Sequence, residues 1–286
     1  MTSVPVVRQL AKGIGFTEGP LWTSRGELVL VSMSRGRVYQ LDLASGEVVR
    51  EWETGGGPNG LAEDAHGTIW VAQNGSSPVR PSGRPVGPGL QAIDGDVVSD
   101  RLMTGCAAPN DLVAGPDGLI WFTDPKPLPG APAGRVCTYD PVTSELRTRI
   151  EGIDFPNGLA FGPDPAELYI ADSAAHVIRR YVIGPDNADD QGVWAELPGG
   201  SPDGIAFDTD GRLLVAAFEH DEVLVFSPEG QAERSIPTGP GSRPTNLCFA
   251  GEDLSVLVIT VASGGRVLTV DEEFHGRLPS PWISRG

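Results

Sequence analysis

Hydrophobic residues along the chain occur in short runs. Some runs alternate with polar residues and some are apolar throughout, and turn residues separate one run from the next. Both patterns are typical of β-strands when turns bound them. No segment of eleven or more residues shows a convincing 3.6-residue apolar period, which argues against folds that alternate strands and helices. The pattern therefore predicts an all-β protein.

One phrase recurs six times: a turn with Pro, an apolar strand, an acidic or Gly turn, and a second apolar strand that ends in small residues. Third strands such as GRVYQLDL and weaker fourth strands such as LRTRIEG follow. Dipeptides such as Asp117-Gly118 and Asp210-Gly211 lie where a hairpin must turn between the first two strands. The copies begin at Phe16, Gly56, Ala107, Asp154, Gly200 and Ser242.

A repeat of roughly 40 to 50 residues with four strands is the signature of a propeller blade. We therefore predict that residues 1–286 form a single domain, a six-bladed β-propeller with four-stranded antiparallel blades. A β-sandwich is the alternative, but it would need six phased copies to arise by coincidence. The apolar segment Val4–Leu10 is expected to complete the last blade, and Asn74–Gly89 to form a loop in blade two.

Composition narrows the classes of partner. The formal net charge of -17 argues against nucleic acid and anionic membranes as partners, since both are themselves negative, and it suits a protein that concentrates cations. Cys106, Cys137 and Cys248 are odd in number and lack a CxxC spacing, which indicates a reducing compartment. The N-terminal residues lack the apolar core of a signal peptide, and no run reaches the ~18 apolar residues of a membrane helix. We expect a cytoplasmic protein with a small-molecule substrate and see no pattern that points to a protein partner.

Equivalent positions of the six copies should form a ring, because the first strand of each blade lines the central channel. All the side chains at these positions offer oxygen, which favours hard cations such as Ca²⁺, Mg²⁺ or Mn²⁺, whereas Zn²⁺ usually prefers nitrogen or sulfur. Two carboxylates held together need a cation or a proton between them. Turn formation is the competing explanation for the Asn and Asp residues, but Glu has no special role in turns. The ring positions hold Glu18, Asn59, Asn110, Asn157, Asp203 and Thr245.

Five phrases together resemble the gluconolactonase, or senescence-marker-protein/regucalcin, family across residues 14 to 271: FTEGPLW, PND, FTDP, FPNGLA and SPDG. The resemblance implies a six-bladed propeller with one divalent cation in its channel, Ca²⁺ foremost, that hydrolyses lactones; relatives cleave organophosphate esters. It implies Glu18, Asn157 and Asp203 as metal ligands, Asn110 as a ligand or a substrate contact, and Asp203 as general base.

Elementary chemistry agrees with this assignment. A hard cation can polarise a lactone carbonyl and lower the pKa of a bound water, whose proton Asp203 can accept. No GxSxG motif is present, and none of the four His residues falls on the ring. A non-hydrolytic protein that uses the same site, either a biosynthetic isomerase or cyclase or a ligand-binding module, remains the alternative.

Two departures from the family pattern fall where the substrate pocket is expected. Ala108 stands where sugar lactonases of the family commonly have Arg, and Lys126-Pro127-Leu128 replaces the frequent Pro-Tyr-Gly, so a less polar or differently sized substrate is expected. Asn59, Asn110, Ala108, Asp124 and His220 are the candidate substrate contacts, with structural roles as the alternative for Asp124 and a plain rim position for His220.

Overall fold

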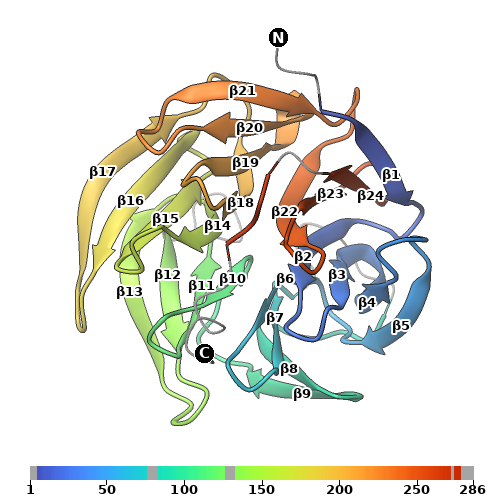
Figure 1. Ribbon diagram of the computed structural model, residues 1–286. Coiled ribbons are helices and arrows are strands. Elements are labelled where there is room, and N and C mark those ends of the chain that lie inside the picture. The colour runs from blue at the N-terminus through green and yellow to red at the C-terminus, as the bar shows by residue number, and fades with distance from the viewer. Residues whose placement is uncertain (1–4, 76–82, 126–132, 272–273, 278–286) are drawn as a thin grey trace.

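The described residues of the computed structural model, 5–75, 83–125, 133–271 and 274–277, form six four-stranded antiparallel sheets. The sheets stand around a central channel as the blades of a propeller (Figure 1), which confirms the predicted fold. In the first five blades the strands follow one another from the channel outward in chain order. The long connection predicted in blade two lies between β7 and β8, and its residues 76–82 are outside the described part, as are Lys126–Leu128 and Val4.

The strand bounds follow the repeat along the chain. Blade 1 contains β2 (Thr17–Trp22), β3 (Leu28–Ser32), β4 (Arg37–Leu41) and β5 (Val48–Glu53), and blade 2 contains β6 (Pro58–Glu63), β7 (Ile69–Gln73), β8 (Gly89–Asp94) and β9 (Val97–Leu102). Blade 3 contains β10 (Leu112–Ala114), β11 (Ile120–Asp124), β12 (Gly134–Tyr139) and β13 (Leu146–Ile153), and blade 4 contains β14 (Pro156–Phe161), β15 (Glu167–Asp172), β16 (Val177–Ile183) and β17 (Ala188–Glu196). Blade 5 contains β18 (Pro202–Phe207), β19 (Leu213–Ala217), β20 (Glu222–Phe226) and β21 (Ala232–Pro237), and blade 6 contains β22 (Pro244–Ala250), β23 (Val256–Val261), β24 (Arg266–Asp271) and β1 (Val7–Ala11).

The last blade joins the two ends of the chain. β1 pairs antiparallel with β24, with Val7 opposite Val270 and Gln9 opposite Leu268. Without β1 the outer edge of β24 would be unpaired, and blade 6 would not be tied to the start of blade 1. Figure 1 shows this pairing of the blue and dark red strands at the rim.

The hydrophobic core lies between blades, because each blade buries both of its faces against its neighbours. Trp121 of blade 3 is fully buried and meets Phe161 of blade 4 edge to face, with ring centroids 5.7 Å apart. Trp70 of blade 2 packs against Tyr139 of blade 3 with tilted rings whose centroids are 5.5 Å apart. Within the described residues, no helix is long and apolar enough to span a bilayer.

Two short 3-10 helices interrupt the repeat at equivalent places. η1 (Met33–Arg35) follows the second strand of blade 1, and η2 (Phe218–His220) follows the second strand of blade 5. Because second strands end where first strands begin, both helices lie at the end of the channel that carries the predicted ring.

Candidate metal centre

A pocket of about 390 Å³ opens at the end of the channel where the first strands begin. We call it the ring pocket. It brings together the ring side chains of five blades, whereas Thr245 of blade 6 lines no part of it. The hydroxyl of Thr245 instead donates to the carbonyl oxygen of Thr17 at 2.9 Å and meets the Thr260 hydroxyl at 2.8 Å. The described residues that line the pocket are Phe16, Glu18, Met33, Asn59, Asn110, Phe155, Asn157, Ser173, Ala174, Ser201, Pro202, Asp203, Phe218 and Glu219.

A local irregularity turns the ring side chains toward the channel. In blades 1, 2, 4 and 5 the pairing of the first strand with the second shifts register at the ring residue, as between Pro156 and Leu159 in blade 4. A shift of this kind bends the strand and re-aims the side chain beside it. Gly follows the ring residue in these blades because neighbouring first strands approach closely: a Cβ on Gly158 would lie 2.3 Å from the carbonyl oxygen of Asp203.

The carboxyl groups at the ring are buried close to one another. Glu18 and Asp203 are 4% and 8% exposed. Burial raises the pKa of Glu18 to about 8, and the neighbouring Asp111 carboxylate adds to this rise. Burial also raises the pKa of Asp203 well above its usual range, with the Glu18 and Asp111 charges as further causes and a hydrogen bond from Asn157 acting in the opposite direction. The site therefore demands positive charge, either as protons or as a cation.

The carboxamides leave oxygen atoms available to a ligand. The Oδ1 atom of Asn59 is buried and has no hydrogen-bond partner. Asn157 donates from Nδ2 to the Ser173 hydroxyl at 3.2 Å, so its Oδ1 is not committed to that bond. A buried acceptor without a donor is costly unless a ligand or water satisfies it.

This donor set fits a hard divalent cation. No three or more His, Cys, Asp or Glu side chains gather into a metal-binding group anywhere in the described ranges. The candidate centre instead mixes two carboxylates, Glu18 and Asp203, with the carboxamide oxygens of Asn59, Asn110 and Asn157. Ca²⁺ and other hard cations accept such mixed oxygen ligands and keep water in their remaining positions.

A hydrogen bond crosses the channel beneath the ring. Asn246 of blade 6 donates from Nδ2 to Oδ2 of Asp111 in blade 3, at 3.1 Å. Asp111 is 8% exposed and its pKa is raised by burial to about 6, while the bonds from Asn246 and the Leu112 amide act against this rise. We call this pair the channel bridge. Its partners occupy the position that is Gly19, Gly60, Gly158 and Gly204 in the other four blades.

Three residues predicted to contact substrate lie outside the ring pocket. The Asp124 carboxylate is 1% exposed, accepts from the Ala107 and Ala108 amides, and pairs with Arg135 at 2.8 Å. Ala108 is buried beside it. His220 is exposed, and its ring packs against Gly199 and Gly200. The geometry thus gives each of them a structural or rim position, whereas Asn59 and Asn110 line the pocket as expected.

The apolar walls of the pocket were missed by reasoning from the sequence. They come from two positions of the repeat: two residues before the ring residue, as in Phe16 and Phe155, and directly after the second strand, as in Met33 and Phe218. The positions of these residues within the repeat could have identified them, but aromatic residues next to strands resemble ordinary core residues.

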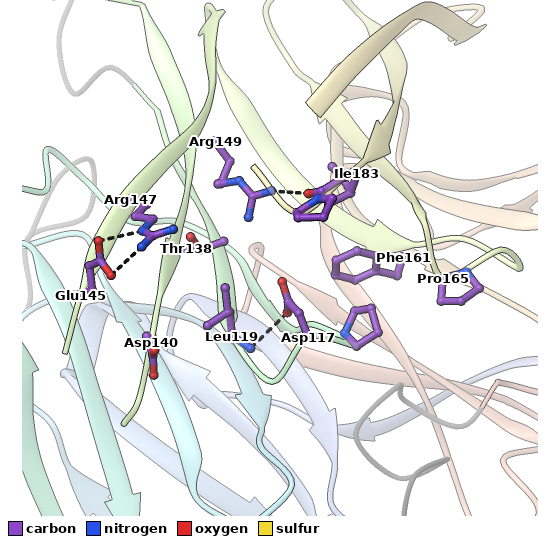
Figure 2. Close-up of a pocket in the computed structure, with 13 residues that line it drawn as sticks. Asp117, Leu119, Thr138, Asp140, Glu145, Arg147, Arg149, Phe161, Pro165 and Ile183 are labelled. Atoms are coloured by element: carbon purple, nitrogen blue, oxygen red, sulfur yellow. Dashed lines mark hydrogen bonds and ion pairs between the residues drawn. The ribbon is translucent and has the colours of Figure 1, made fainter. Parts of the chain in front are cut away.

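The opposite end of the propeller holds two further hollows. A pocket of about 410 Å³, the turn-side pocket, lies at the other mouth of the channel and is lined by the channel bridge and by apolar residues such as Leu61, Leu159 and Leu247. A groove of about 360 Å³ runs between blades 3 and 4 (Figure 2).

The two arginine side chains that Figure 2 labels in this groove are already paired. The Arg149 guanidinium lies over the Trp121 ring at 4.7 Å and donates to the Gly184 carbonyl at 2.8 Å, and Arg147 pairs with Glu145 at 2.7 Å. Neither guanidinium therefore depends on a ligand for a partner.

Known proteins share this sequence pattern and fold. The family model described as SMP-30/Gluconolactonase/LRE-like region matches residues 16–263. A 6-deoxy-6-sulfogluconolactonase of Pseudomonas putida is 38% identical over 131 residues, which are 44% of this chain and 45% of that protein.

Two solved structures superpose over nearly the whole chain. One is a gluconolactonase of Xanthomonas campestris, with a TM-score of 0.77 and 27% identity over 93% of this chain and 89% of that one. The other is a calcium-binding protein, regucalcin, of Agrobacterium tumefaciens, with a TM-score of 0.80 and 20% identity over 96% of each chain. At that identity the second likeness speaks for the fold alone.

Proposed function

The chain belongs to the SMP-30/gluconolactonase/LRE-like family, and we propose that it is a divalent-metal-dependent hydrolase that opens a lactone ring in the ring pocket. One observation carries the proposal. Two buried carboxylates and three carboxamides, one of them with an unpaired acceptor atom, converge on a pocket large enough for a small cyclic ester. Lactone hydrolysis by relatives of this chain supports the choice of reaction.

Glu18, Asn157, Asp203 and Asn110 are the residues proposed to hold the cation. Ca²⁺ is the cation we expect, because every donor is a hard oxygen atom, and Mg²⁺, Mn²⁺ and Zn²⁺ are the alternatives that the test below includes. A cation bound here would polarise the lactone carbonyl and make a bound water more acidic.

The side chains of the ring pocket supply the remaining chemistry. Asp203 accepts a proton from the water whose oxygen attacks the carbonyl carbon, and the Asn157 amide holds the Asp203 carboxylate in place. Collapse of the tetrahedral intermediate breaks the bond between the carbonyl carbon and the ring oxygen. That oxygen then takes up the proton that Asp203 accepted from water and becomes the hydroxyl of the hydroxy acid, so Asp203 is again a carboxylate. Asn59, which lines the pocket and whose buried Oδ1 atom has no hydrogen-bond partner, is proposed to orient the substrate.

A lactone panel with and without EDTA tests the proposal. We expect turnover that EDTA abolishes and that one of Ca²⁺, Mg²⁺, Mn²⁺ or Zn²⁺ restores. Glu18→Gln keeps the shape of the side chain but removes its charge, so we expect it to weaken cation binding at least tenfold by calorimetry.

Asp208→Asn is the matched control for Glu18→Gln. Asp208 is also buried, but it follows the last residue of β18, at the end away from the ring pocket, and pairs with Arg212. Unchanged cation affinity in Glu18→Gln, or turnover that survives EDTA, would defeat the mechanism. A bound cation without turnover of any lactone would favour the non-hydrolytic alternative.

A further inference from the structure

The walls of the ring pocket differ in chemistry from its floor. The floor carries the oxygen donors of the ring, whereas the walls above them combine apolar side chains with the polar Ser173, Ser201 and Glu219. Blade 1 contributes Phe16 and Met33, blade 4 contributes Phe155 and Ala174, and blade 5 contributes Phe218. These are the same three blades that carry Glu18, Asn157 and Asp203.

A repeated backbone bond holds the wall residues in place. The Met33 amide donates to the Phe16 carbonyl at 2.9 Å in blade 1, and the Phe218 amide donates to the Ser201 carbonyl at 3.1 Å in blade 5. In blade 4 the equivalent bond runs from Ser173 to Phe155 at 3.0 Å. Each bond joins the residue after a second strand to the residue two before the ring. The walls are thus fixed by the scaffold, as a preformed site requires.

The side chain of Phe218 is supported from outside the pocket. The Arg243 guanidinium lies 5.7 Å from the centroid of its ring, on an exposed side chain of blade 6. A cation over an aromatic face stabilises the position of that ring. Phe218 is therefore anchored through its backbone and through its ring while it lines the pocket.

Blades 2 and 3 present small residues at the first wall position. Gly57 in blade 2 and Ala108 in blade 3 lie two residues before their ring positions, as Phe16 and Phe155 do in blades 1 and 4. Most of the bulky side chains of the described walls thus lie on the side of blades 1, 4 and 5, where Ser173, Ser201 and Glu219 are the polar lining residues. An alkyl or aryl group seated against the apolar side chains would be removed from water, whereas a hydroxyl against them would lose its water partners without gaining new ones.

We propose that the substrate is a lactone that carries an alkyl or aryl substituent, in preference to a polyhydroxylated sugar lactone, and that Phe218 is a specificity residue that contacts this substituent. The inference rests on the proposed function, since it places the lactone carbonyl at the floor and the substituent against the wall.

Six-membered lactones that differ only in their substituents test the inference. We expect kcat/KM of the Ca²⁺-loaded protein to rise about three- to fourfold per methylene from δ-valerolactone through δ-hexalactone to δ-octanolactone, because each methylene leaves water for an apolar wall. D-Glucono-1,5-lactone should react at least tenfold more slowly than δ-octanolactone. In Phe218→Ala the rise along this series should flatten.

Two further variants separate specificity from folding. Phe218→Leu restores an apolar side chain and should recover most of the rise. Phe161→Ala removes another half-buried Phe at the opposite end of the propeller and should leave the rise unchanged. A higher kcat/KM for gluconolactone than for δ-octanolactone, or an undiminished rise in Phe218→Ala, would overturn the inference and leave the hydrolase proposal standing. Absence of turnover with every lactone would overturn both.

Discussion

The two mouths of the central channel are similar in size and opposite in chemistry. The ring pocket, of about 390 Å³, collects carboxylates and carboxamides, whereas the turn-side pocket, of about 410 Å³, is lined mainly by Leu, Ile, Val and Phe. The first strands of the blades, or the residues directly before them, contribute to both pockets, although blade 6 lines only the turn-side pocket. Polar groups stand where each strand begins, and an apolar residue stands two or three positions later, as in Asn157 and Leu159 of blade 4 or Asp203 and Ile205 of blade 5.

The comparison shows where this fold keeps its symmetry and where it breaks it. Apolar residues recur in every blade at the turn-side mouth, because they pack the first strands against one another. Among the described residues that line the ring pocket, the charged side chains belong to blades 1 and 5, and the bulky apolar ones to blades 1, 4 and 5. Packing therefore follows the repeat, while the candidate chemistry depends on departures from it.

The largest effect should be the loss of kcat caused by a substitution at the ring mouth. Asp203→Asn keeps the size of the side chain but removes the proton acceptor and one carboxylate, so we expect kcat for lactone hydrolysis to fall about 10³-fold. Steady-state kinetics of metal-loaded protein measures this. The thermal midpoint of the variant, taken alongside, shows whether the fold is intact. A loss smaller than about tenfold would mean that another group accepts the proton.

The second largest effect should come from the turn-side mouth and should concern stability. Leu247 is 3% exposed and packs between blades 5 and 6. Leu247→Ala should lower the free energy of unfolding by about 3 kcal/mol, because it leaves a cavity in the core. Urea denaturation measures that loss. The kcat/KM of the folded variant should stay within about twofold of the parent, and a larger change would show that the two mouths are not independent.

A smaller effect, on the pH dependence of the free energy of unfolding, should appear in the metal-free protein. Because the pKa of Glu18 rises from its ordinary 4.5 to about 8, the folded state binds more protons than the unfolded state between these values. This contribution to stability is complete below pH 4.5 and is lost as the pH rises through about 8, at up to about 1.4 kcal/mol per pH unit for each such group.

Urea denaturation of EDTA-treated protein at pH 5, 6.5 and 8 measures this slope. Glu18→Gln should flatten it, and saturating Ca²⁺ should raise stability most at pH 8, where the ring carries the most uncompensated charge. A free energy of unfolding that rises from pH 5 to pH 8 without metal would contradict the expected burial of charge at the ring mouth.

The repeat made the fold and much of the ring predictable, because strand phase within a blade is a local property of the sequence. Glu18, Asn59, Asn110, Asn157 and Asp203 line one pocket for that reason. Thr245 does not line the pocket, because its hydroxyl donates to the carbonyl oxygen of Thr17 instead.

Other features depend on residues that meet only in three dimensions. Asp124 occupies a plausible pocket position in the repeat, but Arg135 lies opposite it in the register of β11 and β12 and takes up its charge. The partners of the channel bridge are 135 positions apart in the chain. Their departure from Gly was visible in the sequence, whereas their contact across the channel was not.

The channel bridge also affects the route by which ligands enter and leave the ring pocket. Asp111 and Asn246 join opposite blades below the ring, so the channel is spanned between its two mouths. We therefore expect a ligand that enters the ring pocket to leave through the same mouth. The product must then dissociate before a new substrate can bind, so a slowly released product competes with substrate for the same pocket mouth.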